Sequence, residues 1–398
     1  MLLSDLDLLR RLVAIDSTSA ISNLPIAHEL ANYCDGAAVE LLHSPDGAKA
    51  NLLIRFGPEG DGGLILSGHM DAVPATETNW ESDPFTLTER DDRYVGRGTA
   101  DMKGFLAVAT NAALASQSLR KPLYLLFTYD EEVGTLGAKQ FVATWDRARP
   151  LPRHCIIGEP TSFRPVRAHK GHLKLRFTVT GKSAHSGYPH LGENAIEKAR
   201  PLLDALSNLR RELESEPIEH AELFADAPYV PLNIATIHGG SAVNIVPDRC
   251  VIEVGIRLLP GMTAASMLTR AREAIGGRAS RPPGPGCPAP DDSDRARRPL
   301  DAGGTPAPLI EIVGESPPML LDRSSEIYQA VQPHATKGRP ESVSFASDAG
   351  WLQSLGIDCL IFGPGAIEVA HQANEFTPKD EFHRARAILR ELIARFCA

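Results

Sequence analysis

The sequence predicts an α/β fold in which a mixed, largely parallel sheet domain is interrupted by a smaller α+β domain. In the first 170 residues, short apolar runs alternate with polar loops and helical segments, as is typical of strands buried between two layers of helices. In the middle of the chain, 173–179 and 250–257 alternate apolar and polar residues, which indicates strands with one exposed face. A chain of 398 residues is long enough for two domains.

The expected elements follow one another in that rhythm. An amphipathic helix with Ser4 as a possible cap opens the chain, and its apolar face comprises Leu6, Leu9, Leu12 and Val13. Next come strands at 51–56, 63–67, 122–128 and 154–157, with helices at 102–115 and 136–145. The middle adds helices at 193–213, which Pro201 should kink, and at 264–275, and a last strand at 309–313. After it we expect a helix near 324–331, a strand at 359–362 and a closing helix from about 381.

These patterns predict two domains with defined boundaries. Residues 1–173 and 316–398 form the larger, catalytic domain, and 174–315 form the inserted one. Within the insert, the 33 residues of 276–308 include eight prolines and six glycines. Because so few of them are apolar, we expect a flexible loop there.

The composition argues against some kinds of partner and indicates where the protein is located. The net charge of −9 argues against nucleic acid or an anionic membrane as the main partner. The N-terminus lacks the basic start of a signal peptide, and no apolar run approaches the roughly 20 residues of a membrane span. Six scattered cysteines without a CxxC pair fit reduced, buried thiols. We therefore expect a cytoplasmic protein.

The first candidate site segment is Ser67-Gly-His-Met-Asp at the end of an apolar strand. Residues two apart on a strand point the same way, so His69 and Asp71 can face one cleft. A histidine that binds a metal needs a partner on its other ring nitrogen, and Asp71 is placed to provide one. A surface H-x-D at a strand end is an equally common explanation.

Two further acidic segments each have an ordinary explanation. Asp101 precedes a helix in a glycine-rich loop and could be a simple N-cap. Glu131 and Glu132 directly follow a strand and could form a solvated acidic turn. Adjacent carboxylates at a strand end repel each other unless a cation or a shared proton compensates. A metal site would use one as a ligand and the other as a general base.

Glu159 follows another strand, and His371 follows a strand and a glycine turn. Ligands of open α/β sheets bind beyond the carboxyl ends of the strands, where most of these segments lie. Two histidines, three carboxylates and no cysteine suit divalent ions such as zinc, cobalt or manganese. With one carboxylate shared, five ligands would hold two ions, as two-metal hydrolysis requires.

These five segments, in this order, resemble the metallopeptidase and deacylase family that includes aminoacylase, glutamate carboxypeptidase, succinyl-diaminopimelate desuccinylase and acetylornithine deacetylase. The resemblance covers nearly the whole chain. It implies that Asp101 bridges two ions, zinc being preferred, and that Glu131 is the general base. It also implies a cis peptide after Asp101. The ligands that it implies are His69, Asp101 and Glu159 for one ion, and Asp101, Glu132 and His371 for the other.

The resemblance also assigns roles to the inserted domain, which corresponds to the family's lid and usual dimer interface. His185, within Ser-Ala-His-Ser-Gly, matches a histidine that stabilises the oxyanion, often across a homodimer. Asn244 and Arg257 match positions that hold a substrate carboxylate, and Lys170 is another possible anion contact. From the sequence alone, a surface salt bridge between Arg257 and Glu253 is an equal alternative. The loop at 276–308 departs from the family, which has a shorter connection there.

The resemblance implies hydrolysis of the amide of a small N-acyl amino acid. Segments such as G-R-G-T-A-D-M-K-G and F-G-P-G-A-I-E-V-A-H-Q-A-N-E-F are most similar to the acetylornithine deacetylases. That branch implies conversion of N-acetyl-L-ornithine to L-ornithine and acetate in arginine biosynthesis. The alternatives are desuccinylase activity, a broader aminoacylase or dipeptidase activity, and a non-catalytic binding protein on the same fold.

Overall fold

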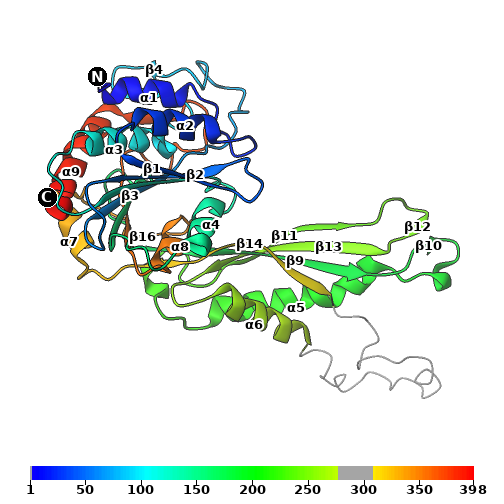
Figure 1. Ribbon diagram of the computed structural model, residues 1–398. Coiled ribbons are helices and arrows are strands. Elements are labelled where there is room, and N and C mark those ends of the chain that lie inside the picture. Colours follow the sequence, from blue (N-terminus) through cyan, green and yellow to red (C-terminus); the bar gives the residue numbers. More distant parts are fainter. Residues whose placement is uncertain (1, 277–307) are drawn as a thin grey trace. The chain divides into compact units, whose positions relative to one another are not determined.

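The computed structural model describes residues 2–276 and 308–398, and the chain divides into two compact units (Figure 1). Unit 1 comprises Met1–His169 and Met319–Ala398, and unit 2 comprises Lys170–Pro318. Nearly all of the loop expected at 276–308 lies outside the described residues. Among the described residues, no helix is both long and apolar enough to cross a membrane.

Unit 1 is built on a six-stranded sheet. Strands β6, β3, β7 and β17 are parallel to one another, and β1 and β2 extend the sheet at the β6 edge through antiparallel pairing. This confirms the mixed, largely parallel sheet that the sequence predicts. In sheet order the strands are β1 (Ala38–His43), β2 (Ala50–Phe56), β6 (Leu123–Thr128), β3 (Leu64–His69), β7 (His154–Ile157) and β17 (Asp358–Ile361).

Helices cover both faces of this sheet, because alternate residues of each strand point to opposite faces. On β3, Leu64 and Leu66 belong to one core, whereas Ile65 belongs to the other. The first core includes residues of α1 (Asp5–Val13), α2 (Leu24–Tyr33), α3 (Gly104–Leu114), α7 (Glu326–Val331) and α9 (Lys379–Cys397). The second includes residues of α4 (Leu136–Thr144) and α8 (Ala349–Gln353).

The predicted cap of the first helix is confirmed, and its apolar face differs from the prediction at one position. The Ser4 side chain accepts the backbone N–H of Asp7 at 3.1 Å and so caps α1. Leu9, Leu12 and Val13 are buried as expected, but Leu8 completes this face and Leu6 is only half-buried.

Short strands complete unit 1. Strands β18 (Phe376–Pro378), β5 (Arg93–Val95) and β4 (Thr88–Glu89) form one antiparallel sheet. Strand β8 (Ala168–His169) lies between β15 (Met319–Leu320) and β16 (Ser342–Val343). The pairing of β18 with β5 matters for the site, because it brings the segment after His371 beside the segment before Asp101.

Unit 2 contains a four-stranded antiparallel sheet in the order β11 (Leu232–Gly239), β13 (Arg249–Leu258), β9 (Gly171–Thr180) and β14 (Leu309–Ser316). Alternate residues of β9 and β13 are buried, as the half-exposed strand pattern predicts. Its helices are α5 (Ala195–Ser215), which runs through Pro201, and α6 (Ala264–Gly276). A two-stranded ribbon pairs β10 (Ala184–His185) with β12 (Ile245–Val246).

Candidate metal centre

Three of the candidate ligand segments lie at the same edge of the unit 1 sheet. His69 is the last residue of β3, Glu131 and Glu132 follow β6, and Glu159 follows β7. The strands are parallel and in register, with His69 opposite Thr128, so their carboxyl ends meet. This is the placement expected of a site in an open α/β sheet.

His69 lies at the centre of this group and is 1% exposed. Its Nε2 is 2.9 Å from Asp101 Oδ1 and 3.9 Å from Glu159 Oε1. Its Nδ1 is 2.9 Å from the main-chain carbonyl oxygen of Asp71 and 3.6 Å from the Asp71 carboxylate. The carbonyl therefore makes the shorter contact with the ring, and it leaves Nε2 directed at the carboxylates.

The carboxylate of Asp71 also binds the backbone of the acidic pair, which was not predicted from the sequence. It accepts the backbone N–H of Glu131 at 3.1 Å and that of Glu132 at 3.2 Å. It also accepts the Ser19 hydroxyl at 2.8 Å. Asp71 therefore fixes the main chain of the acidic pair, and Ser19 in turn fixes Asp71.

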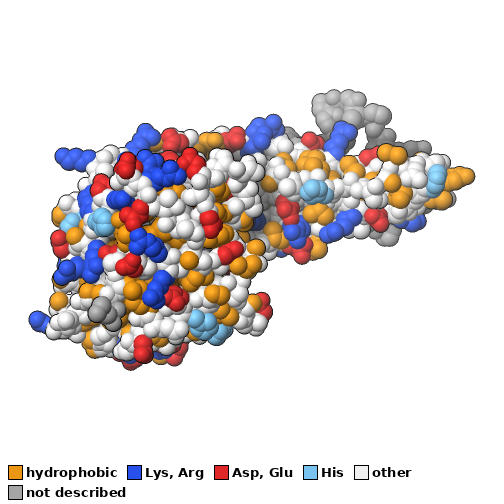
Figure 2. All heavy atoms as spheres, turned by 90° about the horizontal axis from the view of Figure 1, so that it is seen from above, with side chains coloured by type: hydrophobic (Ala, Val, Ile, Leu, Met, Phe, Trp, Pro, Cys, Tyr) orange, Lys and Arg blue, Asp and Glu red, His pale blue; other side chains and the backbone are white. Residues whose placement is uncertain are grey.

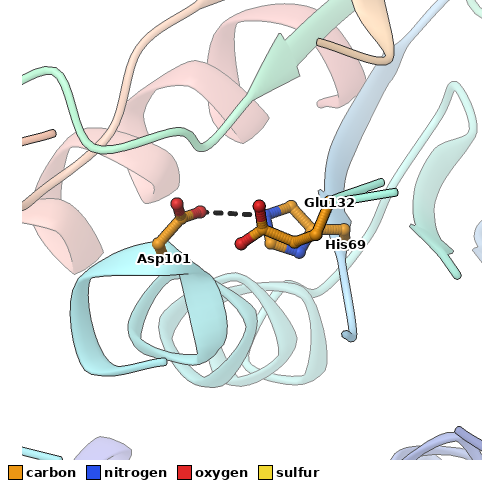
Figure 3. Close-up of side chains that lie close together, drawn as sticks. All are labelled: His69, Asp101 and Glu132. Carbon is orange, nitrogen blue, oxygen red and sulfur yellow. Dashed lines mark hydrogen bonds and ion pairs between the residues drawn. The ribbon is translucent and has the colours of Figure 1, made fainter. Parts of the chain in front are cut away.

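The fifth segment joins the others through Asp101. His371 Nε2 is 3.3 Å from Asp101 Oδ2 and 2.9 Å from Glu132 Oε1. Each oxygen of Asp101 thus faces a different imidazole, which is the arrangement of a carboxylate shared between two ions. One ligand atom each from His69, Asp101 and Glu132 lie within 4.8 Å of one another (Figure 3). The Asp101-Met102 peptide is cis, as the family resemblance implies.

The charges of this group call for a cation. Burial raises the pKa of Glu131 and of Glu159 well above the ordinary value, and neighbouring carboxylates raise them further. Burial alone would lower the pKa of His69, but its hydrogen bonds to Asp101 and Asp71 raise it instead. Carboxylate oxygens and imidazole nitrogens that converge in this way fit divalent ions such as zinc.

His371 gives a testable consequence for metal binding. In the metal-free protein, hydrogen bonds to Asp101 and Glu132 raise its pKa to about 10, so the ring is protonated at neutral pH. A histidine that binds a metal must be neutral, so an ion held by His371 would release this proton at any pH between neutrality and about 10. Calorimetric zinc titrations in buffers of different ionisation enthalpy should show proton release at pH 7.5 that diminishes as the pH nears 10. Heats independent of the buffer would contradict this account.

The same hydrogen bonds of His371 make the stability of the metal-free protein depend on pH. A raised histidine pKa stabilises the folded state fully below the unfolded value of about 6.5. That contribution is lost as the pH rises toward about 10.

Asp348, a buried acid beside the end of β6, was not predicted from the sequence. Asp348 is 2% exposed and its Oδ2 accepts the Thr128 hydroxyl at 2.6 Å. Burial raises its pKa to about 6. It lies in the helix α8 region, far from the other segments in sequence, and its own sequence context gave no signal.

The unit 2 candidates His185 and Asn244 lie in segments joined by a backbone hydrogen bond. His185 is exposed, and its Nδ1 accepts the N–H of Gly187 at 3.0 Å. The main-chain carbonyl of Asn244 accepts the N–H of Ser186. These contacts place the segments of His185 and Asn244 side by side.

Arg257 and Lys170 have different surroundings in unit 2. Arg176 bonds Glu253 at 2.7 Å, and among the described residues no ion pair joins Arg257 to Glu253, so the salt-bridge alternative for Arg257 is wrong. Burial lowers the pKa of Arg257. Lys170 is buried, and its Nζ donates to the carbonyls of Ala227 at 2.6 Å and Tyr229 at 2.9 Å.

The chain is similar to known proteins in sequence and in fold. The model of peptidase family M20/M25/M40 matches residues 65–395. The acetylornithine deacetylase of Aliivibrio salmonicida is 37% identical over 96% of this chain and 94% of its own length. That of Edwardsiella ictaluri is 37% identical over 98% and 97%.

Solved structures share the fold at low sequence identity. An M20 family metallo-carboxypeptidase of Sulfolobus solfataricus superposes with a TM-score of 0.74 at 18% identity and covers 98% of this chain and 99% of its own. A dinuclear metal-binding M20 peptidase of Bacillus subtilis gives 0.62 at 13% identity, with 98% and 97% covered.

Fold and site together define an α/β protein with a candidate metal site at one edge of its sheet. The chain belongs to peptidase family M20/M25/M40.

Proposed function

We propose that this protein is a dinuclear metal-dependent hydrolase that converts N-acetyl-L-ornithine to L-ornithine and acetate. The observation that carries the proposal is the placement of Asp101, whose two carboxylate oxygens face His69 and His371 while the Glu131–Glu132 pair is held beside them. The relatives named acetylornithine deacetylase, which align along nearly the whole chain, support the choice of substrate. The pathway that this reaction serves is arginine biosynthesis.

The proposed ligands form two sets, one for each ion, that share Asp101. His69, Asp101 and Glu159 hold one ion, and Asp101, Glu132 and His371 hold the other. Zinc suits this oxygen and nitrogen donor set best, with cobalt and manganese as alternatives. When bound, the two ions polarise the acyl carbonyl and increase the acidity of the attacking water.

The chain's own residues then move the proton. Glu131 removes it from the attacking water and later donates it to the departing amine. Asp71 keeps Glu131 in place through the backbone N–H that it accepts. His185 stabilises the oxyanion, and Asn244, Arg257 and Lys170 bind the substrate carboxylate. The ammonium group of Lys170 already donates to two main-chain carbonyls.

We also propose that unit 2 is a lid that joins two copies of the chain. Exposed apolar residues lie on the ribbon of β10 and β12 and on the segments near it in sequence, and Figure 2 shows apolar side chains at the surface of unit 2. Exposed apolar residues in such a group are typical of interfaces. The residues are Tyr188, Leu191, Ile196, Ile237, Val243 and Ile245.

A dimer in which His185 serves the partner's site makes complementation possible. Glu131→Gln and His185→Ala homodimers should each be inactive. After subunit exchange, a mixed dimer has one site with both residues intact, and random exchange should restore about a quarter of wild-type activity. A mixture of Glu131→Gln with Glu132→Gln is the control and should gain no activity on exchange, because each site of the mixed dimer still carries one of the two changes. No recovery in the first mixture would refute the role of His185 across the dimer.

The substrate is tested by kcat/KM for acetyl-ornithine, acetyl-citrulline, acetyl-methionine and succinyl-diaminopimelate, with metal content measured on the same preparation. Acetyl-ornithine should have the highest value. A higher value for succinyl-diaminopimelate would favour the desuccinylase alternative, and similar values throughout would favour a broad aminoacylase or dipeptidase.

We also propose that the protein is catalytic and that it is cytoplasmic. The complete ligand set and Glu131 argue against a non-catalytic binding protein on the same fold. The five cysteines that the structure describes are buried free thiols, which supports a cytoplasmic location.

A further inference from the structure

Glu375 is a buried acid four residues after His371, and no role is predicted for it from the sequence. It is 1% exposed, although an ionised carboxylate is costly to bury without partners. Its partners lie 274 to 278 residues away in the chain, in the loop that leads to Asp101. It therefore links two segments that carry proposed metal ligands.

The Glu375 carboxylate accepts three backbone N–H groups of that loop. Oε1 accepts from Ala100 at 2.9 Å and from Asp101 itself at 3.0 Å. Oε2 accepts from Gly98 at 3.0 Å. The main-chain carbonyl of Glu375 accepts a fourth, from Gly96 at 2.9 Å. One residue thus fixes the loop along its whole length.

Arg97 balances the charge of this carboxylate. Its guanidinium is 3.0 Å from Glu375 Oε2, and its side chain is 1% exposed. Its other terminal nitrogen bonds both oxygens of Glu77 at 2.9 Å, and the Trp80 ring centre is 5.1 Å from the guanidinium carbon. The position of Glu375 is therefore fixed by its ion pair as well as by the loop.

We propose that Glu375 is a positioning residue for metal binding. It orders the loop so that Asp101 stands between His69 and His371 before an ion arrives. The loop needs such a support because Gly98 adopts a left-handed φ of 81°, which favours glycine, and a glycine loses more conformational freedom than other residues when the loop becomes ordered. Ordering it in advance removes an entropic cost from metal binding. The inference rests on the proposed function, since it concerns the same metal centre.

Glutamine at position 375 is the sharpest probe of this role. It has the same shape, but it offers one acceptor oxygen and an NH₂ group that only donates. Whichever way the amide turns, its NH₂ faces N–H donors, either those of Ala100 and Asp101 or those of Gly98 and Arg97. The variant also leaves the buried Arg97 with one negative partner fewer.

The matched control is Asp5→Asn in helix α1. Asp5 is also buried, at 7% exposed, and its carboxylate also accepts an arginine, Arg386 at 3.0 Å, and a neutral N–H donor, Asn111 at 2.8 Å. It contacts none of the proposed ligands. Both substitutions remove a negative charge beside an arginine. At Asp5 both donors bond Oδ1, so an asparagine oxygen can still accept them, and Asp5 has no hydrogen bond to Asp101.

The experiment measures the zinc Kd of the full-length protein by competition with a chelator of known affinity. Glu375→Gln should weaken zinc binding by about 10- to 100-fold, the usual effect of losing a group that orients a ligand. Asp5→Asn should stay within about twofold, as expected of a distant site. With cobalt as the probe, the visible absorption spectrum of Glu375→Gln should also change. Both variants should lose thermal stability, so only the metal readouts separate positioning from general support.

An unchanged zinc Kd in Glu375→Gln, or one equal to that of Asp5→Asn, would overturn the proposal. If Glu375→Gln does not fold, Glu375→Asp keeps the charge but is one methylene shorter, and the same comparison of Kd decides. Absence of zinc binding in the wild-type protein would instead overturn the proposed function itself.

Discussion

Replacing Glu131 with glutamine is expected to lower kcat by about 10²- to 10⁴-fold while both ions stay bound. The amide cannot accept a proton from water, but the variant keeps the backbone N–H that Asp71 holds. It also keeps the proposed ligands His69, Asp101 and Glu159, which lie on other segments. Single-turnover kinetics together with zinc content by atomic emission measure the two effects separately.

Glu132→Gln is the matched comparison, because it makes the same change one residue along the chain. Glu132 bonds His371 at 2.9 Å and belongs to the proposed ligand set. This variant should lose zinc affinity as well as rate, and excess zinc should restore part of its activity. A Glu131→Gln protein with near wild-type kcat would refute the assignment of the base. Loss of both ions from that variant would make Glu131 a ligand.

Removal of the metal should abolish activity and lower Tm by an amount on the order of 10 °C. Four carboxylates, those of Asp101, Glu131, Glu132 and Glu159, converge here, and without cations they repel one another. A ligand at 1,000 times its Kd stabilises the native state by about 4 kcal/mol. For domains of about 150–250 residues each kcal/mol corresponds to about 2–4 °C.

Calorimetry before and after dialysis against a chelator measures this effect. Readdition of zinc, cobalt or manganese should restore both Tm and activity, and magnesium should not, because it prefers sites with oxygen ligands and water. The Glu132→Gln variant is the control, and its Tm should fall less because it holds less metal. A chelated protein with unchanged Tm and full activity would eliminate the metal centre.

Much of the fold could be predicted from local patterns. The buried strands of unit 1 are continuous apolar runs, and those of unit 2 alternate, because the first have two covered faces and the second have one. Strand β1 and helix α2 were not predicted. β1 is half-buried, and α2 buries only Ile26, Ala27 and Leu30 and has no side-chain cap hydrogen bond, so neither gave a strong signal.

The residues at the strand ends could also be predicted as a group. His69, Glu131 and Glu159 each follow an apolar run, and parallel strands bring such positions to one edge. Asp101 was different, because its position before a helix looked like an ordinary cap. The sequence by itself thus determined the sheet and the polar residues at its edge.

Only the tertiary structure decided how these residues are oriented. It placed the two oxygens of Asp101 toward His69 and His371, and it gave Glu375 the N–H groups of the Asp101 loop. It also placed Ser19 against Asp71. These contacts join residues that are 32 to 277 positions apart in the chain. Such pairs carry no local signal, because periodicity reports which face a side chain takes, whereas its partner depends on how the whole chain closes on itself.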